Sequence, residues 1–335
     1  MSAFINVMKA IRVAVRVRRR MRGPKRPSWD EDFETWATAL HHYAKRSLAL
    51  PLSVQRQAAH VAVPRPEKTD ARFERVQARG VPAEWFHHSS ADESRVLFYL
   101  HGGGYSIGSV ETHRDVILGL SRASNMTGFA IDYRLAPEHP FPAQLEDALA
   151  AYRFLLDGGV DPKCIVIAGD SAGGGLTLST MIALRDHGEP LPAAAFLISP
   201  WVDLEASGST MAHHEPYDYI SRRVLAAYTR RFVSKKDVRN PLAAPLYAEL
   251  EGLPPLVVHA GGAEVLLDDS QRITERARKA GVPVTFEVSD DMIHAWHLFA
   301  SAFEVCRRDV LRAGKMLREN VERAATGIGA EAVRP

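Results

Sequence analysis

This 335-residue sequence has only two cysteines, no long apolar run and no large excess of charge of either sign. The two cysteines, Cys164 and Cys306, have no spacing typical of a disulfide framework or a metal site, which favours a reducing compartment. No stretch reaches the roughly 18 apolar residues that a membrane-spanning helix needs. The arginines at 16–22 follow and interrupt the first apolar stretch, unlike the charges of a secretory signal. We therefore predict a cytoplasmic protein.

The net charge is close to zero, because 42 Lys and Arg face 40 Asp and Glu. A net charge of +2 gives no whole-protein field for holding nucleic acid, so we expect no nucleic-acid partner. The charge is nevertheless uneven along the chain. Residues 1–26 contain no acidic residue and nine basic ones: Lys9, Arg12, Arg16, Arg18, Arg19, Arg20, Arg22, Lys25 and Arg26. A basic arm therefore precedes a mildly acidic body.

The basic arm allows more than one interpretation. Apolar residues recur in it at helical spacing: Phe4, Met8, Ile11 and Val15. A helix with this stripe could lie on an anionic membrane surface. The alternation of Val13, Val15 and Val17 is typical of a strand instead. We favour a helix that packs on the cap and body, because cap helices also need an apolar stripe.

From about residue 75, short apolar runs alternate with helical stretches. The runs are 96–100, 129–133, 164–168, 195–199, 256–260 and 284–288. Helical periodicity fills gaps between them at 144–156, 172–186 and 268–280. Runs that are apolar throughout are typical of parallel strands covered on both faces, so the alternation predicts a doubly wound parallel sheet. Residues 73–77 and 84–87 could add antiparallel strands at one edge.

This rhythm stops between residues 201 and 246, and residues 30–50 also have a helical pattern outside it. We assign both segments to a lid over one end of the sheet. The predicted division is an N-terminal cap segment with the basic arm, the first part of the core, a cap insertion and the rest of the core: 1–50, 51–200, 201–246 and 247–335.

A glycine-rich segment, GDSAGGG at 169–175, follows the predicted strand 164–168 and opens a helix. This is the G-x-S-x-G pattern in the strand–turn–helix context that holds a serine exposed at a sharp turn. The alternative is that Ser171 only caps the helix. We predict that Ser171 is a nucleophile because a second motif supports the same chemistry.

That second motif is HGGG at 101–104, directly after the predicted strand 96–100. Consecutive glycines let backbone N–H groups turn toward one point, where they stabilise the oxyanion of acyl transfer by about 3 to 4 kcal/mol each. A phosphate-binding turn is the alternative, but this segment has neither a Walker lysine nor a G-x-G-x-x-G pattern. We predict that the oxyanion donors are the N–H groups of Gly103, Gly104 and Ala172.

A serine nucleophile needs a base and an orienting acid, which follow it in the order acid, then histidine, in α/β hydrolases. His294 lies in a loop after the last predicted strand, whereas we expect His297 one turn into the last helix. His294 is therefore the predicted base. Glu264 lies in the loop after the preceding strand, whereas Asp268 and Asp269 fall in the first turn of the next helix and suit its positive end. Glu264 is therefore the predicted acid.

Together with DYRLAPEHPFPA at 132–143, these motifs make the chain resemble the bacterial hormone-sensitive-lipase family of esterases over about residues 70–320. The resemblance implies an α/β-hydrolase fold: an eight-stranded, mostly parallel sheet with an α-helical cap made from the N-terminal segment and an insertion after the sixth strand. It assigns a nucleophile, a base and three oxyanion donors: Ser171, His294, Gly103, Gly104 and Ala172. It also makes the 132–143 block structural rather than catalytic.

The sequence departs from the family pattern at two positions. Glu264 begins Glu-Val-Leu where many members have Asp-Pro-Leu, which puts a glutamate in the place of the acid. Asp291 replaces the glycine of Gly-Met-x-His in the segment that ends at His294. This residue could alter the loop or the potential at the site.

The sequence therefore predicts a carboxylesterase that hydrolyses short to medium acyl esters with a Ser-His-Glu triad and needs no metal or organic cofactor. An amidase or aryl acylamidase with the same triad stays open as an alternative. A non-catalytic small-molecule receptor on this fold is a further alternative, against which the complete set of serine, histidine and acid argues. The expected partners are a small-molecule ester and, as the resemblance implies, a second copy bound through the last strand and helix.

Overall fold

Eight strands form one sheet in the order β1-β2-β4-β3-β5-β6-β7-β8 in the computed structural model, which describes residues 2–62 and 69–326. The strands are β1 Arg72–Ala78, β2 Val81–His87, β3 Asp92–Leu100, β4 Met126–Ile131, β5 Ile165–Asp170, β6 Ala194–Ile198, β7 Leu256–Gly261 and β8 Val284–Ser289. β1 and β2 pair antiparallel, β2 pairs antiparallel with β4, and the other neighbours are parallel. The predicted eight-stranded, mostly parallel sheet is confirmed.

One predicted strand ends earlier than its apolar run indicated. β4 stops at Ile131, so Asp132 and Tyr133 lie beyond it. The Asp132 carboxylate accepts a hydrogen bond from the Val110 N–H at 2.7 Å, and the Tyr133 hydroxyl donates to the His101 carbonyl at 2.7 Å. These two residues of the 132–143 block therefore serve the loops at the end of the sheet instead of extending the strand.

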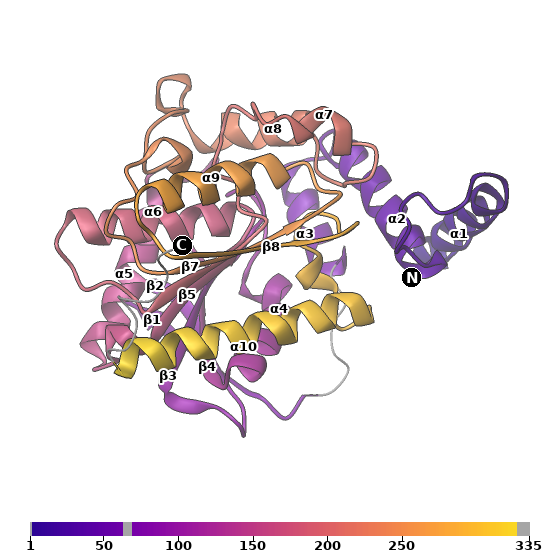
Figure 1. Ribbon diagram of the computed structural model, residues 1–335. Helices are drawn as coiled ribbons and strands as arrows, with labels where there is room; N and C mark the ends of the chain where they lie inside the picture. The colour runs from indigo at the N-terminus through magenta and orange to yellow at the C-terminus, as the bar shows by residue number, and fades with distance from the viewer. Residues whose placement is uncertain (1, 63–68, 327–335) are drawn as a thin grey trace.

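Helices cover both faces of the sheet (Figure 1). The ten helices of the described residues are α1 Ser2–Arg22, α2 Glu31–Ser47, α3 Leu52–Ala62, α4 Val110–Ser124, α5 Ala143–Asp157, α6 Ala172–Asp186, α7 Thr210–His214, α8 Arg222–Phe232, α9 Leu267–Lys279 and α10 Glu304–Thr326. Helices α4 and α10 lie on one face, and α5, α6 and α9 on the other (Figure 1). Two apolar cores result, since Phe98 of β3 belongs to one and Tyr99 to the other.

Three further helices lie over the carboxyl ends of the parallel strands. Side chains of α2, α3 and α8 line the same cavity as Ser171, which follows β5. Helix α8 belongs to the predicted cap insertion and α2 to the predicted N-terminal cap segment. The boundary at residue 50 stays a prediction, and α3, which begins at Leu52, lines the cavity as well.

The basic arm forms helix α1, so the strand interpretation of its valines is wrong. Val15 is buried and Met8 and Ile11 are half-buried, while the side chain of Phe4 lies outside the described residues. The helix packs on α2, and its arginines form ion pairs with acidic residues in the first turn of α2. The pairs are Arg12–Asp32, Arg16–Glu31, Arg18–Glu34 and Arg19–Glu34. In the part of the chain that the structure describes, no helix is long and apolar enough to cross a membrane.

Candidate active site

Ser171 occupies a strained turn between β5 and α6. Its backbone has φ 54° and ψ −121°, a conformation that non-glycine residues rarely adopt and that clusters at functional sites. The side chain makes no capping hydrogen bond to α6, so the helix-cap alternative receives no support. Two main-chain bonds hold the turn, from the Ser171 N–H to the Ile198 carbonyl at 2.8 Å and from the Trp201 N–H to the Ser171 carbonyl at 2.9 Å.

The glycines after the serine let α6 begin close to the centre of the sheet. A Cβ atom on Gly173 would lie 2.0 Å from the carbonyl oxygen of Leu100, which is the last residue of β3. Only glycine allows this approach. The elbow, as we call the sharp turn at Ser171, therefore lies against the end of β3, from which the HGGG segment continues.

The HGGG segment turns back on itself at its third and fourth residues. Gly103 has φ 111° and Gly104 has φ 59°, both positive, and a Cβ on Gly104 would lie 2.3 Å from the Tyr228 ring. The N–H groups of Ser106 and Ile107 donate to the Gly103 carbonyl and close the turn. Ala172 is the first residue of α6, so its N–H has no partner within the helix.

Asp170, the residue before the nucleophile, ties the HGGG segment to the elbow. Its carboxylate accepts hydrogen bonds from the Tyr99 hydroxyl at 2.8 Å and the Gly102 N–H at 3.0 Å, and it lies 3.3 Å from Nε2 of His113. Burial alone would raise the pKa of Asp170, but His113 and the hydrogen bond from Tyr99 lower it to about 2. The sequence motif includes this position, yet we did not predict a role for it.

The predicted base and acid are neighbours in the structure without a hydrogen bond between them. Nδ1 of His294 lies 3.9 Å from Oε2 of Glu264, beyond hydrogen-bond distance. Both side chains are buried, and Nδ1 of His294 and Oε1 of Glu264 have no partner among the described residues. Ser199 instead donates to Oε2 of Glu264 at 2.5 Å and accepts from the Ala295 N–H at 3.0 Å. A single serine thus contacts both the acid and the segment that carries the base.

Burial favours the neutral form of both groups. It lowers the pKa of His294 to about 4, against the opposing charge of Asp170. It raises the pKa of Glu264 well above its usual range. His294 is therefore an uncharged imidazole at neutral pH, able to accept a proton. The charge of Asp170 favours the charged form of His294, and the hydrogen bond from Ser199 favours the charged form of Glu264.

Asp218, from the segment between α7 and α8, joins the two loops that carry these residues. Its carboxylate accepts from the Val265 N–H at 2.9 Å and the His294 N–H at 3.3 Å, and its carbonyl oxygen lies 2.7 Å from Nδ1 of His41 on α2. The side chain is fully buried, and burial raises its pKa to about 7 against the N–H groups that favour the charge. The sequence offered no local signal for this residue.

The other candidate acids serve different contacts. Asp268 and Asp269 lie in the first turn of α9, as predicted. The Asp268 carboxylate accepts from the Ser209 hydroxyl at 2.7 Å, whereas the Asp269 carboxylate accepts from the N–H groups of Val202 and Asp203. Neither aspartate is paired with His294. Their carboxylates connect α9 to the segment after β6.

The placement predicted for His297 is wrong. It lies in a short 3-10 helix, Trp296–Phe299, and the last helix begins only at Glu304. The ring is fully buried, and its Nε2 lies 3.2 Å from Nδ1 of His259 in β7. His297 therefore belongs to the packing beneath the site and does not line the cavity.

Asp291, which stands where the family pattern has glycine, adopts φ 63°. Its carboxylate accepts from the Arg26 guanidinium at 2.7 Å and the Ser28 N–H at 3.0 Å, and its carbonyl accepts from the Trp29 indole at 2.6 Å. Burial would raise the pKa of Asp291, but the contacts of its carboxylate with Ser28 and Arg26 lower it. The departure from glycine thus attaches the N-terminal segment to the loop that carries His294.

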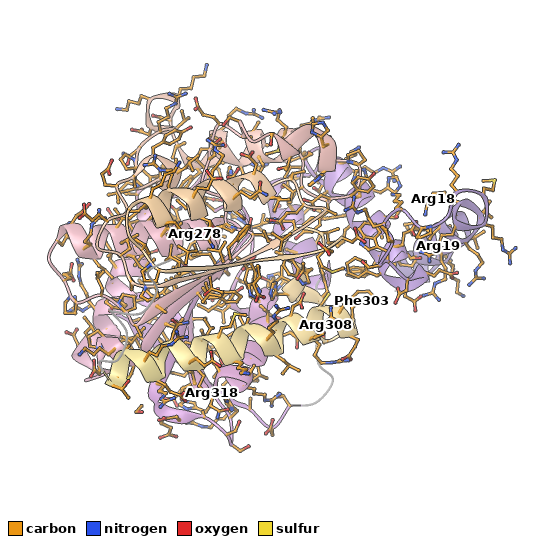
Figure 2. All side chains as sticks on the ribbon, viewed as in Figure 1. Arg18, Arg19, Arg278, Phe303, Arg308 and Arg318 are labelled. Carbon is orange, nitrogen blue, oxygen red and sulfur yellow. The ribbon has the colours of Figure 1, made fainter. Side chains whose placement is uncertain are left out.

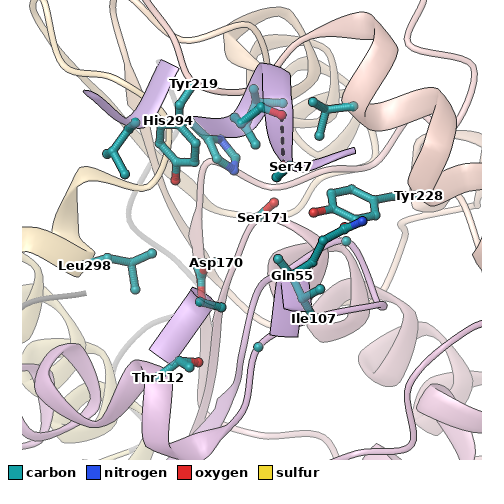
Figure 3. Close-up of a pocket in the computed structure, with 18 of the residues that line it drawn as sticks. Ser47, Gln55, Ile107, Thr112, Asp170, Ser171, Tyr219, Tyr228, His294 and Leu298 are labelled. Atoms are coloured by element: carbon teal, nitrogen blue, oxygen red, sulfur yellow. Dashed lines mark hydrogen bonds between the residues drawn. The ribbon is translucent and has the colours of Figure 1, made fainter. Parts of the chain in front are cut away.

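The predicted nucleophile, base and two oxyanion donors line one cavity of about 160 Å³. Figure 3 shows the Ser171 hydroxyl and the His294 ring facing this cavity, with Tyr219 and Tyr228 at its wall. The rest of the wall is mainly apolar and includes Leu40, Ile107, Val224, Leu225, Leu298 and Phe299. Glu264 and Ala172 do not line the cavity. Glu264 lies beside His294, and Ala172 is the first residue of α6, directly after Ser171.

Comparisons with known proteins agree with this geometry. The alpha/beta hydrolase fold family matches residues 97–298. An acetyl-hydrolase of Streptomyces hygroscopicus is 43% identical over 248 residues, which are 74% of this chain and 81% of the relative. The putative acetyl-hydrolase LipR of Mycobacterium tuberculosis is 36% identical over 255 residues, 76% of this chain and 82% of the relative.

Solved structures extend the similarity to the whole fold. A crystal structure of an esterase from the bacterial hormone-sensitive lipase family has a TM-score of 0.81 and 41% identity, and the match covers 85% of this chain and 98% of that one. The structure of EstE5 soaked with p-nitrophenyl butyrate has a TM-score of 0.81 and 38% identity over 86% of this chain and 99% of that one. On these matches and on its strained serine elbow, the chain belongs to the alpha/beta hydrolase fold family, within the bacterial hormone-sensitive-lipase family of esterases.

Proposed function

We propose that this protein is a serine carboxylesterase in which Ser171 is the nucleophile, His294 the base and Glu264 the orienting acid. The observation that carries the proposal is the convergence of Ser171, His294, Gly103 and Gly104 on one apolar cavity. Relatives named acetyl-hydrolase, esterase and carboxylic ester hydrolase support the same reaction class.

In the first half of the reaction, Ser171 Oγ attacks the ester carbonyl while His294 accepts the hydroxyl proton. The N–H groups of Gly103, Gly104 and Ala172 stabilise the charge on the carbonyl oxygen. The intermediate then collapses to an acyl-serine, and the alcohol leaves with the proton from His294. In the second half, water replaces the serine as nucleophile, and the acid product and free Ser171 are released.

Glu264 acts when His294 becomes positively charged. In the resting site, Nδ1 of His294 and Oε1 of Glu264 lack hydrogen-bond partners, and 3.9 Å separates Nδ1 from the other carboxylate oxygen. An imidazolium attracts the carboxylate strongly in a buried site, so this pair closes as the proton arrives. The longer side chain of glutamate gives the acid enough reach for this closure.

The cavity supports esters with short to medium acyl chains as substrates. Its wall is mainly apolar and includes side chains from α2, α3 and α8, which suits an acyl group, and its volume of about 160 Å³ favours a short or medium chain. The similar structure of EstE5 was soaked with p-nitrophenyl butyrate, a short-chain ester. We therefore expect kcat/KM to be highest for acetyl to octanoyl esters.

The test combines covalent labelling with a substrate series. A serine-directed organophosphonate should label the wild-type protein once, at Ser171, and abolish hydrolysis. Ser171→Ala should remove both labelling and turnover, whereas Ser47→Ala, a serine that lines the same cavity, should retain both. Near wild-type turnover by Ser171→Ala would overturn the mechanism. A matched anilide hydrolysed as fast as the ester would assign the site to amides instead.

A further inference from the structure

Helix α1 has a second apolar face, separate from the one that packs on α2. Its residues recur at intervals of three and four and are all exposed: Val7, Ala10, Ala14, Val17 and Met21. Val13 widens the face on one side. The four larger side chains are strongly exposed, at 55% for Val7, 60% for Val13, 50% for Val17 and 71% for Met21. This outer face of α1 is distinct from the stripe of Met8, Ile11 and Val15.

Exposed apolar side chains are concentrated at this end of the chain. Nine large ones occur among the described side chains of residues 6–60 and 69–326, and seven of them lie within residues 7–54. The remaining two, Val288 and Leu311, stand apart on β8 and α10. Figure 2 shows α1 projecting from the body with Arg18 and Arg19 upon it, so little of the chain shields its outer face.

Basic side chains border the outer face on the side of Val13. At 100° per residue, Lys9 and Arg20 fall beside Val13. Both are exposed, and within the described residues neither has an ion-pair partner, unlike Arg12, Arg16, Arg18 and Arg19. Two cations that α2 leaves unneutralised thus flank the exposed apolar face.

These observations decide between two partners for the outer face, a second α1 helix and an anionic lipid surface. Pairing of two α1 helices through it would place Lys9 and Arg20 of one copy against the same residues of another, and α1 contains no acidic residue to compensate. An anionic lipid surface satisfies both features at once, since apolar side chains enter the headgroup boundary while lysine and arginine contact the lipid charges. The helix, about 30 Å long, would lie flat on such a surface.

We infer that the outer face of α1 docks the protein on anionic membrane surfaces. The side chains of Val13, Val17 and Met21 provide the apolar contact, and Lys9 and Arg20 provide the charge. None of these residues lines the cavity, so docking and ester hydrolysis are separate properties of the chain.

The test is co-sedimentation of the full chain with vesicles of phosphatidylcholine alone or with one third phosphatidylglycerol. Wild-type protein should bind the anionic vesicles at low salt and be released at high salt. Replacement of Lys9 and Arg20 by Gln should weaken binding about 25-fold, because each cation near the surface contributes roughly fivefold. Replacement of Val13, Val17 and Met21 by Gln should abolish sedimentation with the anionic vesicles. Leu311→Gln, an equally exposed apolar residue on α10, should change nothing.

Hydrolysis of a soluble p-nitrophenyl ester should be unchanged in every variant, which shows that each remains folded. Absence of wild-type binding to anionic vesicles at low salt would overturn the inference, as would wild-type binding by the Val13, Val17 and Met21 variant. Light scattering distinguishes the other occupant: a dimer that this variant dissociates would assign the outer face to a second copy of the chain and also overturn it.

Discussion

The two halves of the candidate site are built in different ways. The nucleophile half consists of the elbow at Ser171 and the HGGG turn, and backbone geometry and glycines determine its shape. The half with Glu264 and His294 lies at the ends of β7 and β8, and side chains from distant segments hold it, chiefly Ser199 and Asp218. The backbone turn of the proposed oxyanion hole therefore stands beside the proposed acid and base, whose Oε2 and Nδ1 atoms are 3.9 Å apart.

The largest expected effect comes from removing the acid. Glu264→Gln should reduce kcat roughly 10⁴-fold, because the buried imidazolium would lose its counter-charge. Asp268→Asn is the control, since its carboxylate contacts Ser209 and Arg272 and should affect only stability, by about 1 kcal/mol. Steady-state kinetics and thermal melts of both variants make the comparison. Loss of turnover in folded Asp268→Asn, without loss in Glu264→Gln, would reverse the assignment.

The oxyanion turn gives the next largest effect. Gly104→Ala would place a Cβ 2.3 Å from the Tyr228 ring and displace the donor N–H, so we expect kcat to fall about 10²- to 10³-fold. Gly188→Ala is the matched control, because Gly188 also has a positive φ, 68°, but nothing lies within 4 Å of the added atom. The control should lose about 1 kcal/mol of stability and no activity. Equal activity of the two variants would contradict a role for the Gly104 N–H.

A substitution at Asp218 tests how far the half with Glu264 and His294 depends on the hydrogen bonds that join its two loops. Asp218→Asn puts an amide N–H₂ where one carboxylate oxygen accepted a backbone N–H, so the loops of Glu264 and His294 should separate and kcat should fall about tenfold with little change in KM. Asp269→Asn, an equally buried carboxylate with two backbone donors outside these loops, is the control. A similar fall in kcat for both variants would mean a general effect on stability.

The smallest effect concerns the attachment of the N-terminal segment. Because the pKa of Asp291 is lowered in the folded protein, its ionised form favours folding above the ordinary value of 3.8, and this contribution is lost as pH falls through the lowered value. Asp291→Asn should therefore lower stability by about 1 kcal/mol at neutral pH, with little change in kcat. Thermal melts should show the difference from wild type shrinking as the pH falls below 3.8. A difference independent of pH would contradict the ionic attachment.

The nucleophile half could be predicted from the sequence because its determinants are consecutive in the chain. A strand, a glycine and Ser171 in G-x-S-x-G specify the elbow, and HGGG after β3 specifies the turn. Asp170 lies inside the first motif. Asking why an acid precedes the nucleophile would have found its contact with Gly102.

The acid–base half could be predicted only as far as its position after β7 and β8. Glu264 and Ser199 are 65 residues apart, and Asp218 and His294 are 76 apart, so no local pattern connects them. Their contacts exist only after the sheet and cap segments have packed together. His297 was misplaced because the apolar segment after His294 forms a 3-10 helix, and the helical periodicity of α10 starts at Glu304.

The contact between Arg26 and Asp291 has a consequence for the order in which the protein folds. The two residues are separated by 265 positions, so Asp291 is made long after Arg26. Closure of so long a loop costs much chain entropy, so such contacts form late, after β8 has joined the sheet. During translation, the N-terminal helices therefore wait until the loop of His294 has been made. Their docking against the loop of His294 is expected to be among the last steps that complete the enzyme.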